Sequence, residues 1–204
     1  MFNIPTQKPA AIDWSEYGVT EYLLVAHPDK KATERIVAEK KAFTKTYRES
    51  IAVKTHPHIT IANWVAEEET EKTVVPWIQN ICNVHARFPV TLRNFSGFVP
   101  HTIFLQVQNA QPFKQLAKSL KGLDYFIRAT ECPPLRLISK PHLTIARRLP
   151  EETYFKALQT YLQRTFQQSF IVNELTLIKR TSQFKTCQMV HVFPLAPAQP
   201  NLFN

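Results

Sequence analysis

The chain has 204 residues, 44% hydrophobic and 20% charged, which allows one large domain or two small lobes. It contains no run of 18 or more apolar residues and no basic-then-apolar leader, so we expect no membrane span, no signal peptide and, by default, a cytoplasmic location. Three glycines are too few for a phosphate-binding loop, which excludes dinucleotide-binding and P-loop enzymes. The net charge of +9 favours an anionic partner such as a phosphate ester or nucleic acid.

Strand and helix patterns follow one another along the chain. An arm rich in proline and polar residues is expected over residues 1–20, and a loose tail over residues 196–204. Asp29 opens a helical pattern to about Tyr47, and Ser96-Gly97 is predicted as a turn between two strands. The other predicted strands cover residues 21–26, 58–64, 88–95, 102–107, 170–179 and 188–195, with one more around His142. The other predicted helices start near 67 or cover 111–123 and 150–165.

A phrase of six residues occurs twice, as Pro-His-aliphatic-Thr-Ile-Ala at residues 57–62 and again at residues 141–146. An X-Pro step followed by Ile, Leu and Thr is typical of a strand. Residues i and i+2 of a strand point to the same side, so His58 shares a face with Thr60, and His142 with Thr144. Each copy therefore presents a proton-transfer group beside a hydroxyl donor, while the intervening aliphatic residues face a core.

The duplicated phrase belongs to a longer internal repeat, because the strand and helix patterns of the two halves correspond at offsets of 82 to 84 residues. We expect one bilobal domain over 21–195, with lobe repeats over about 21–98 and 101–180 and a closing strand over 188–195. The predicted fold class is α+β, with two pseudo-twofold-related lobes that each contain an antiparallel sheet and flanking helices. His58 and His142 would then face each other across a central cleft.

Two histidines on opposite walls suit in-line displacement at phosphorus, because the entering and leaving oxygens lie on opposite sides of that atom. One imidazole takes a proton from water while the other gives a proton to the leaving alcohol. The hydroxyls of Thr60 and Thr144 would donate hydrogen bonds to the non-bridging oxygens, where negative charge develops. We therefore interpret His58 and His142 as catalytic and the two threonines as substrate-binding.

The paired motifs His58-Ile59-Thr60-Ile61 and His142-Leu143-Thr144-Ile145 resemble those that define the 2H phosphoesterases, a family that includes bacterial 2′-5′ RNA ligase-like proteins and cyclic phosphodiesterases. The resemblance covers about residues 20–195. It implies a bilobal α+β fold, no cofactor and no metal requirement. It also implies hydrolysis of a 2′,3′-cyclic phosphate or a 2′-5′ phosphodiester, carried by RNA ends or a small nucleotide. By the same resemblance, His58 is the proton donor and His142 the acceptor.

The family often carries an arginine just after its second motif, and Arg147 matches that place as a further substrate-binding residue. Strand alternation disagrees, because residues 142, 144, 146 and 148 share a face, which points to Arg148 instead. A strand end or a bulge after Ala146 would reconcile the two expectations. A solvated basic pair is the alternative.

Other interpretations stay open. His56 and His58 would be ligands in a metal-dependent phosphohydrolase, although neither motif contains a carboxylate. A non-catalytic RNA-binding module would use the charge of +9 and the 11% aromatic content. His56 and Lys140 occupy equivalent places and either attract an anionic substrate or are plain surface charge. Tyr22 and Phe104, paired by the repeat, either stack a base or pack in the core. No obligatory protein partner is indicated.

Overall fold

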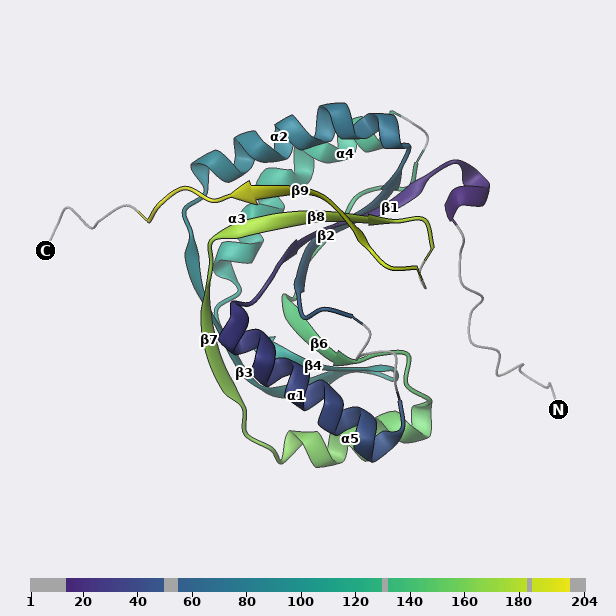
Figure 1. Cartoon of the computed structure of the whole chain (residues 1–204), viewed down its shortest axis with the longest axis vertical. Helices are drawn as coiled ribbons and strands as arrows, with labels where there is room; N and C mark the ends of the chain where they lie inside the picture. Colours follow the sequence, from purple (N-terminus) through teal and green to yellow (C-terminus); the bar gives the residue numbers. More distant parts are fainter. Residues whose placement is uncertain (1–13, 50–54, 130–131, 183–184, 199–204) are drawn as a thin grey trace, which may run out of the picture.

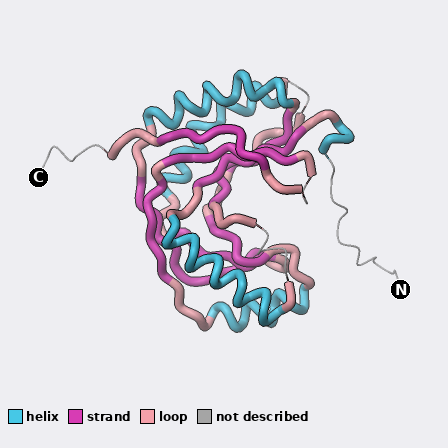
Figure 2. Tube along the Cα trace, viewed as in Figure 1, coloured by secondary structure: helices cyan, strands magenta, loops and turns pink. Residues whose placement is uncertain are grey.

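The computed structural model describes residues 14–49, 55–129, 132–182 and 185–198. The part of the predicted arm before residue 14 and the part of the tail after residue 198 therefore lie outside the described residues. The described chain forms two lobes, each a sheet of antiparallel strands covered by helices (Figures 1 and 2). This arrangement confirms the predicted α+β class. No helix among the described residues is long and apolar enough to cross a membrane.

The two sheets have corresponding strand orders. The first runs β5-β2-β1-β8-β9 and the second β6-β4-β3-β7. The strands are β1 (Thr20–Ala26), β2 (Ile59–Ala66), β3 (Phe88–Phe98), β4 (Thr102–Val107), β5 (Arg136–Leu137), β6 (His142–Ala146), β7 (Gln167–Val172), β8 (Glu174–Arg180) and β9 (Gln188–Pro194). The helices are η1 (Trp14–Tyr17), α1 (Lys30–Tyr47), η2 (Glu68–Thr70), α2 (Glu71–Val84), α3 (Gln111–Ser119), η3 (Leu120–Gly122), α4 (Leu123–Arg128) and α5 (Glu151–Leu162).

The two halves of the sequence exchange elements between the lobes. Strand β3 follows β2 along the chain but pairs with β4 and β7 of the second sheet, whereas β8, late in the chain, pairs with β1 of the first. Helix α1 packs on β6 and β7, and α3 and α4 contact β2. The repeats predicted over about 21–98 and 101–180 therefore do not coincide with the two sheets, because each half supplies a strand and helical cover to the other.

The single strand predicted over residues 170–179 is wrong, because the structure contains two strands that belong to different sheets. Strand β7 pairs with β3, the chain turns out of that sheet at Asn173, and β8 pairs with β1. The buried positions show the change. Burial alternates in β7, where Phe170 and Val172 are buried and Ile171 is exposed, whereas three successive residues, Leu175, Thr176 and Leu177, are buried in β8.

The predicted turn at Ser96-Gly97 is also wrong, because β3 continues through both residues and Phe98 still pairs with Thr102. Gly97 instead allows helix α5 to pack closely against β3. A Cβ atom there would overlap the hydroxyl oxygen of Tyr154 on α5. The helix thus lies so close to the strand that only a residue without a side chain fits between them.

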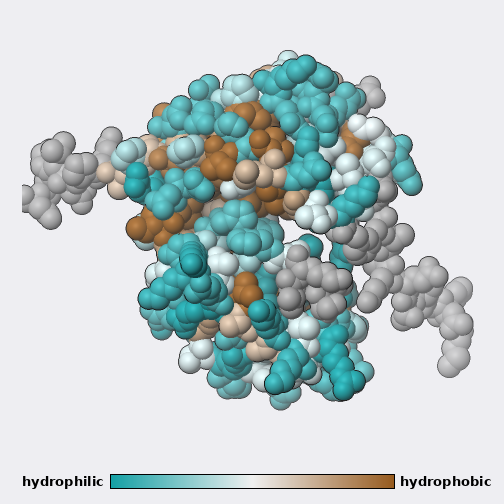
Figure 3. Space-filling view, in the orientation of Figure 1, coloured by the Kyte–Doolittle hydropathy of each residue, from teal (hydrophilic) through white to brown (hydrophobic). Residues whose placement is uncertain are grey.

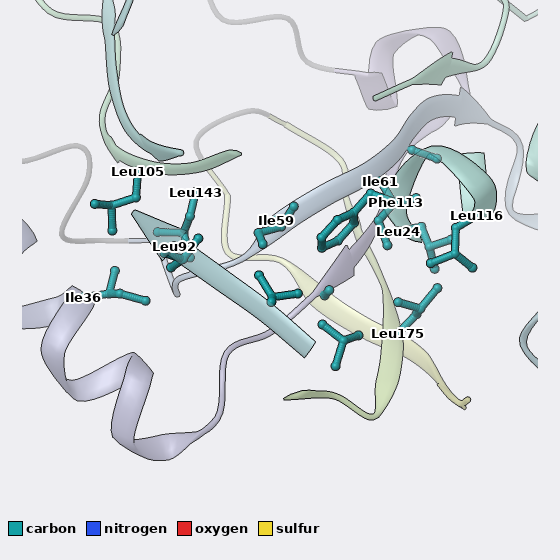
Figure 4. Packing of buried hydrophobic residues seen from close by; sticks show 14 of the residues in the cluster. Leu24, Ile36, Ile59, Ile61, Leu92, Leu105, Phe113, Leu116, Leu143 and Leu175 are labelled. Carbon is teal, nitrogen blue, oxygen red and sulfur yellow. The ribbon is translucent and has the colours of Figure 1, made fainter. Parts of the chain in front are cut away.

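One hydrophobic core runs through both lobes. Ile59 of β2 and Leu143 of β6 are fully buried in it, beside residues from both sheets (Figure 4). Helix α1 begins as predicted after Asp29, whose carboxylate accepts a hydrogen bond from the backbone N–H of Ala32. Hydrophilic side chains cover most of the face seen in Figure 3, and the hydrophobic ones on it gather over the lobe of the first sheet. The shared core fixes the position of β2 relative to β6.

Candidate active site

The two histidine motifs occupy equivalent places in the two sheets. His58 directly precedes β2, and His142 is the first residue of β6. Strand β2 pairs with β1 and strand β6 with β4, which are the first strands of the two sequence halves. The strands β2 and β6 also contact each other where the lobes meet. The duplicated phrase therefore lies at the junction of the lobes.

Each motif contains a one-residue bulge at the same isoleucine. In β2, Thr60 lies opposite Val25 and Ala62 opposite Leu24, so Ile61 is the extra residue. In β6, Thr144 lies opposite Phe104 and Ala146 opposite Ile103, so Ile145 is the extra residue. A bulge reverses the alternation beyond it, because adjacent partner residues face opposite sides of the sheet.

The second bulge accounts for the conflict over the arginine. Because Ile145 is the extra residue, Ala146 faces away from the side of Thr144, and the next residue, Arg147, returns to that side. The bulge thus falls one residue earlier than expected. Strand β6 ends at Ala146, and Arg148 has a left-handed backbone with a φ angle of 57°, which turns the chain away after the strand.

The charge of Arg147 reaches the first histidine. It is one of the causes that lower the pKa of His58, and it also lowers the pKa of Lys40. The Nε atom of Arg147 is buried and has no hydrogen-bond partner among the described residues. An arginine at the end of β6 therefore lies within electrostatic range of the histidine that precedes β2, and its Nε donor has no hydrogen-bond partner among the described residues.

Both imidazoles are held by the same local hydrogen bond. Nδ1 of His58 lies 2.8 Å from the carbonyl oxygen of His56, and Nδ1 of His142 lies 2.8 Å from the carbonyl oxygen of Lys140. A carbonyl only accepts, so Nδ1 carries the hydrogen and donates it. Nε2 of each neutral ring is then the nitrogen without a hydrogen, which can accept a proton. His56 and Lys140 thus contribute backbone carbonyls to the site, a role that their side chains could not have revealed.

The surroundings of both rings favour the neutral imidazole. Burial is the largest cause that lowers the pKa of His58, to about 4, and the charges of His27, Lys40 and Arg147 lower it further. Burial also lowers the pKa of His142, with a smaller contribution from the charge of Lys140. The hydrogen bonds to the two carbonyls act in the opposite direction. Burial therefore lowers the pKa values of the two histidines more than the neighbouring positive charges do.

Two residues beside His58 were missed by the sequence analysis. His27 follows β1, and its Nδ1 donates to the carbonyl of Pro57 at 3.0 Å, while its ring lies 6.2 Å from that of His58. Lys40 on α1 is only 3% exposed, and its ammonium donates to the carbonyl oxygen of Thr55 at 3.0 Å. A signal for the lysine was present, because it is spaced with the buried residues of its helix, Ala32, Ile36 and Phe43.

The base-stacking alternative for Tyr22 and Phe104 is not supported, because both rings are buried, at 1% and 0% exposure. Tyr22 donates a hydrogen bond to Glu71 at 2.7 Å and stacks on Trp64. Two surface hollows of about 150 and 70 Å³ include none of the predicted site residues in their linings. Within the described part of the chain, no group of three or more His, Cys, Asp or Glu residues is placed to hold a metal ion.

Solved structures share this fold. LigT of E. coli, in a complex with 3′-AMP, matches with a TM-score of 0.63 and 16% identity, over 87% of this chain and 98% of that chain. TT0787 of Thermus thermophilus matches with a TM-score of 0.61 and 18% identity, over 88% and 100%. The PDE domain of MHV ns2 matches with a TM-score of 0.52 and 14% identity, over 78% and 99%. At these identities the likeness establishes a fold of the LigT type.

The sequence itself defines the family. The model of the 2′-5′ RNA ligase superfamily matches residues 28–183, so the chain belongs to that superfamily. A search of curated protein sequences found no significant match. Family and fold together confirm the resemblance to the 2H phosphoesterases and support a phosphoesterase-like function.

Proposed function

We propose that this protein is a metal-independent phosphodiesterase that hydrolyses a 2′,3′-cyclic phosphate or a 2′-5′ phosphodiester, carried by RNA ends or a small nucleotide. The observation that supports the proposal most is the matched geometry of the two motifs. Each histidine commits Nδ1 to the carbonyl two residues earlier, which leaves Nε2 for proton transfer. Each is followed by a half-buried threonine on the same side of its strand.

In the proposed reaction, Nε2 of neutral His142 takes a proton from water as the water oxygen attacks phosphorus. The bond from phosphorus to the leaving oxygen breaks, and Nε2 of protonated His58 gives its proton to that oxygen. The hydroxyls of Thr60 and Thr144 donate hydrogen bonds to the non-bridging oxygens, whose charge increases in the transition state. Arg147 offsets part of the same charge. A second turnover requires His58 to regain a proton and His142 to lose one.

The proposed proton donor is charged only when the substrate is present. With a pKa of about 4, His58 is neutral in the free protein at neutral pH. A phosphate anion placed beside it favours the imidazolium and raises its pKa. The negative charge of the substrate thus offsets the burial and the cations that otherwise keep this ring neutral.

Structures of E. coli LigT hold 3′-AMP, phosphate, NADP+ and ATP. The net charge of +9 suits such anionic molecules. Nucleotide phosphates are therefore the substrate class to test first.

The test is a panel of nucleoside 2′,3′-cyclic phosphates and 2′-5′-linked dinucleotides, assayed with excess EDTA. We expect turnover by the wild type, and a rate about two to four orders of magnitude lower in His58→Ala and in His142→Ala. The double variant should lose little more than the worse single variant, because both residues act in one step. The matched control is His85→Ala, since His85 is also half-buried but bonds Ser119 on the surface of the first lobe.

Two outcomes would contradict the proposal. A rate that EDTA abolishes and a divalent cation restores would favour the metal-dependent phosphohydrolase. Binding of RNA without turnover of any substrate in the panel would favour the non-catalytic RNA-binding module.

A further inference from the structure

An exposed aromatic side chain lies beside the second histidine. Phe98 is the last residue of β3 and is 37% exposed, whereas Phe104 beneath it is fully buried. Their ring centroids are 4.4 Å apart and their planes differ by 27°, so the rings are stacked. Phe98 pairs with Thr102 and Phe104 with Thr144, which places both rings on the face of the sheet that His142 shares.

His142 and Lys140 both flank this pair of rings. The His142 ring centroid lies 4.8 Å from that of Phe98 and 5.1 Å from that of Phe104. The ammonium of Lys140 lies 5.6 Å and 5.4 Å from the same two centroids. The ammonium lies over both rings at cation–π distance, and because its two distances are nearly equal it is not on the side of Phe98 that faces away from Phe104. Neither neighbour therefore covers the outer face of Phe98.

Core packing explains only the inner face of Phe98. Phe104 is already fully buried, and the inner face of Phe98 covers it. Packing against Phe104 does not explain why the exposed Phe98 ring has both His142 and the exposed Lys140 next to it. A flat apolar face with a cation beside it matches a nucleotide, whose base stacks on aromatic rings and whose phosphate is an anion.

We propose that the outer face of Phe98 is the stacking platform for the nucleobase of the substrate, on the His142 side of the scissile phosphate, and that Lys140 binds an anionic oxygen of the same nucleotide. The inference rests on the proposed function and adds the nucleoside as the part of the substrate that is recognised. Stacking uses the flat face that every base has, so purine and pyrimidine nucleotides should both bind.

The experiment compares Phe98→Leu and Phe98→Trp with the wild type. Leucine keeps apolar cover over Phe104 without a flat face, and tryptophan keeps a flat face. Calorimetry measures the Kd for 3′-AMP and for ribose 3-phosphate, which lacks the base, and steady-state assays measure KM for adenosine 2′,3′-cyclic phosphate. Phe155→Ala is the control, because Phe155 on α5 is 49% exposed and contacts Tyr154 instead of His142.

We expect Phe98→Leu to raise the Kd for 3′-AMP by about 10-fold to 100-fold and the KM in parallel, and to change the Kd for ribose 3-phosphate by less than about 2-fold. Phe98→Trp and Phe155→Ala should bind 3′-AMP like the wild type. Equal weakening of both ligands by Phe98→Leu, or no weakening of either, would overturn the inference. Base-dependent binding without any turnover would support the platform while refuting the proposed function.

Discussion

Lys40 offers a quantitative test of how the site is built, because it is a lysine buried beside a second cation. Its burial is the main cause that lowers its pKa from an ordinary 10.5 to about 8, and the charge of Arg147 lowers it further. A cation buried without an ion pair destabilises the folded state. Among the described residues, its ammonium bonds the carbonyl of Thr55 and no carboxylate. Replacement by methionine, Lys40→Met, removes the charge and keeps a long apolar chain.

The lowered pKa sets the size and the direction of the effect. Each pKa unit corresponds to about 1.4 kcal/mol, so protonated Lys40 lowers the free energy of unfolding by about 3 kcal/mol at pH 7. The folded pKa is below the unfolded one, so this cost is fully present below about pH 8 and disappears as the pH rises to the unfolded value. Relative to Lys40→Met, the wild type should therefore gain about 2 to 3 kcal/mol between pH 7 and pH 10.

Urea denaturation of both proteins at pH 7 and pH 10 measures this difference. Lys40→Met gains stability at pH 7 because the buried charge is removed. It also loses the hydrogen bond to Thr55, which is worth about 1.5 to 3 kcal/mol for a charged donor. The two effects largely cancel, so the free energies of unfolding of the wild type and the variant should be close at pH 7. Lys41→Met is the control, because Lys41 is the exposed next residue of the same helix. Parallel pH dependence of the wild type and Lys40→Met, with equal m-values, would refute the reasoning.

Three further outcomes are expected. Thr60→Val and Thr144→Val keep strand propensity but remove a donor to the phosphate, so each should lower kcat by about two orders of magnitude, and unchanged kinetics in both would remove them from the site. Gly97→Ala should cost about 1 to 3 kcal/mol in urea denaturation, because its Cβ meets Tyr154, and a stability equal to wild type would show that α5 moves away freely. Because substrate raises the lowered pKa of His58, the pH profile of kcat with EDTA present should lie at higher pH than that of kcat/KM, and coincident profiles would contradict the proposed proton donor.

Local patterns in the sequence predicted the local parts of the structure. The step from Asp29 into a helix and the repeated His-x-Thr phrase depend on residues within one or two turns of each other, and both are visible in a single sequence. The site histidines could be named for the same reason. Their role as proton-transfer groups stays a prediction.

Pairing between distant strands could not be predicted in this way. Residues 170–179 are apolar enough for one strand, and the change of sheet is marked by burial that alternates in β7 and becomes continuous from Leu175 to Leu177 in β8. The bulge at Ile145 depends on how β6 meets β4, so the position of Arg147 became evident only from the paired strands. The burial of Lys40 likewise depends on α1 crossing to the second lobe.

The exchange of elements between the lobes determines when the protein can become complete during synthesis. Strand β1 is synthesised long before its partner β8, because β8 ends only at Arg180, which pairs with Glu21 across a separation of 159 residues. Until then β1 has an open edge, which exposes unpaired backbone groups to other chains. Contacts that close so late in the sequence slow folding. A chain that stops before Glu174 would therefore contain both histidine motifs and still lack β8, the second partner of the strand β1 on which the first motif pairs.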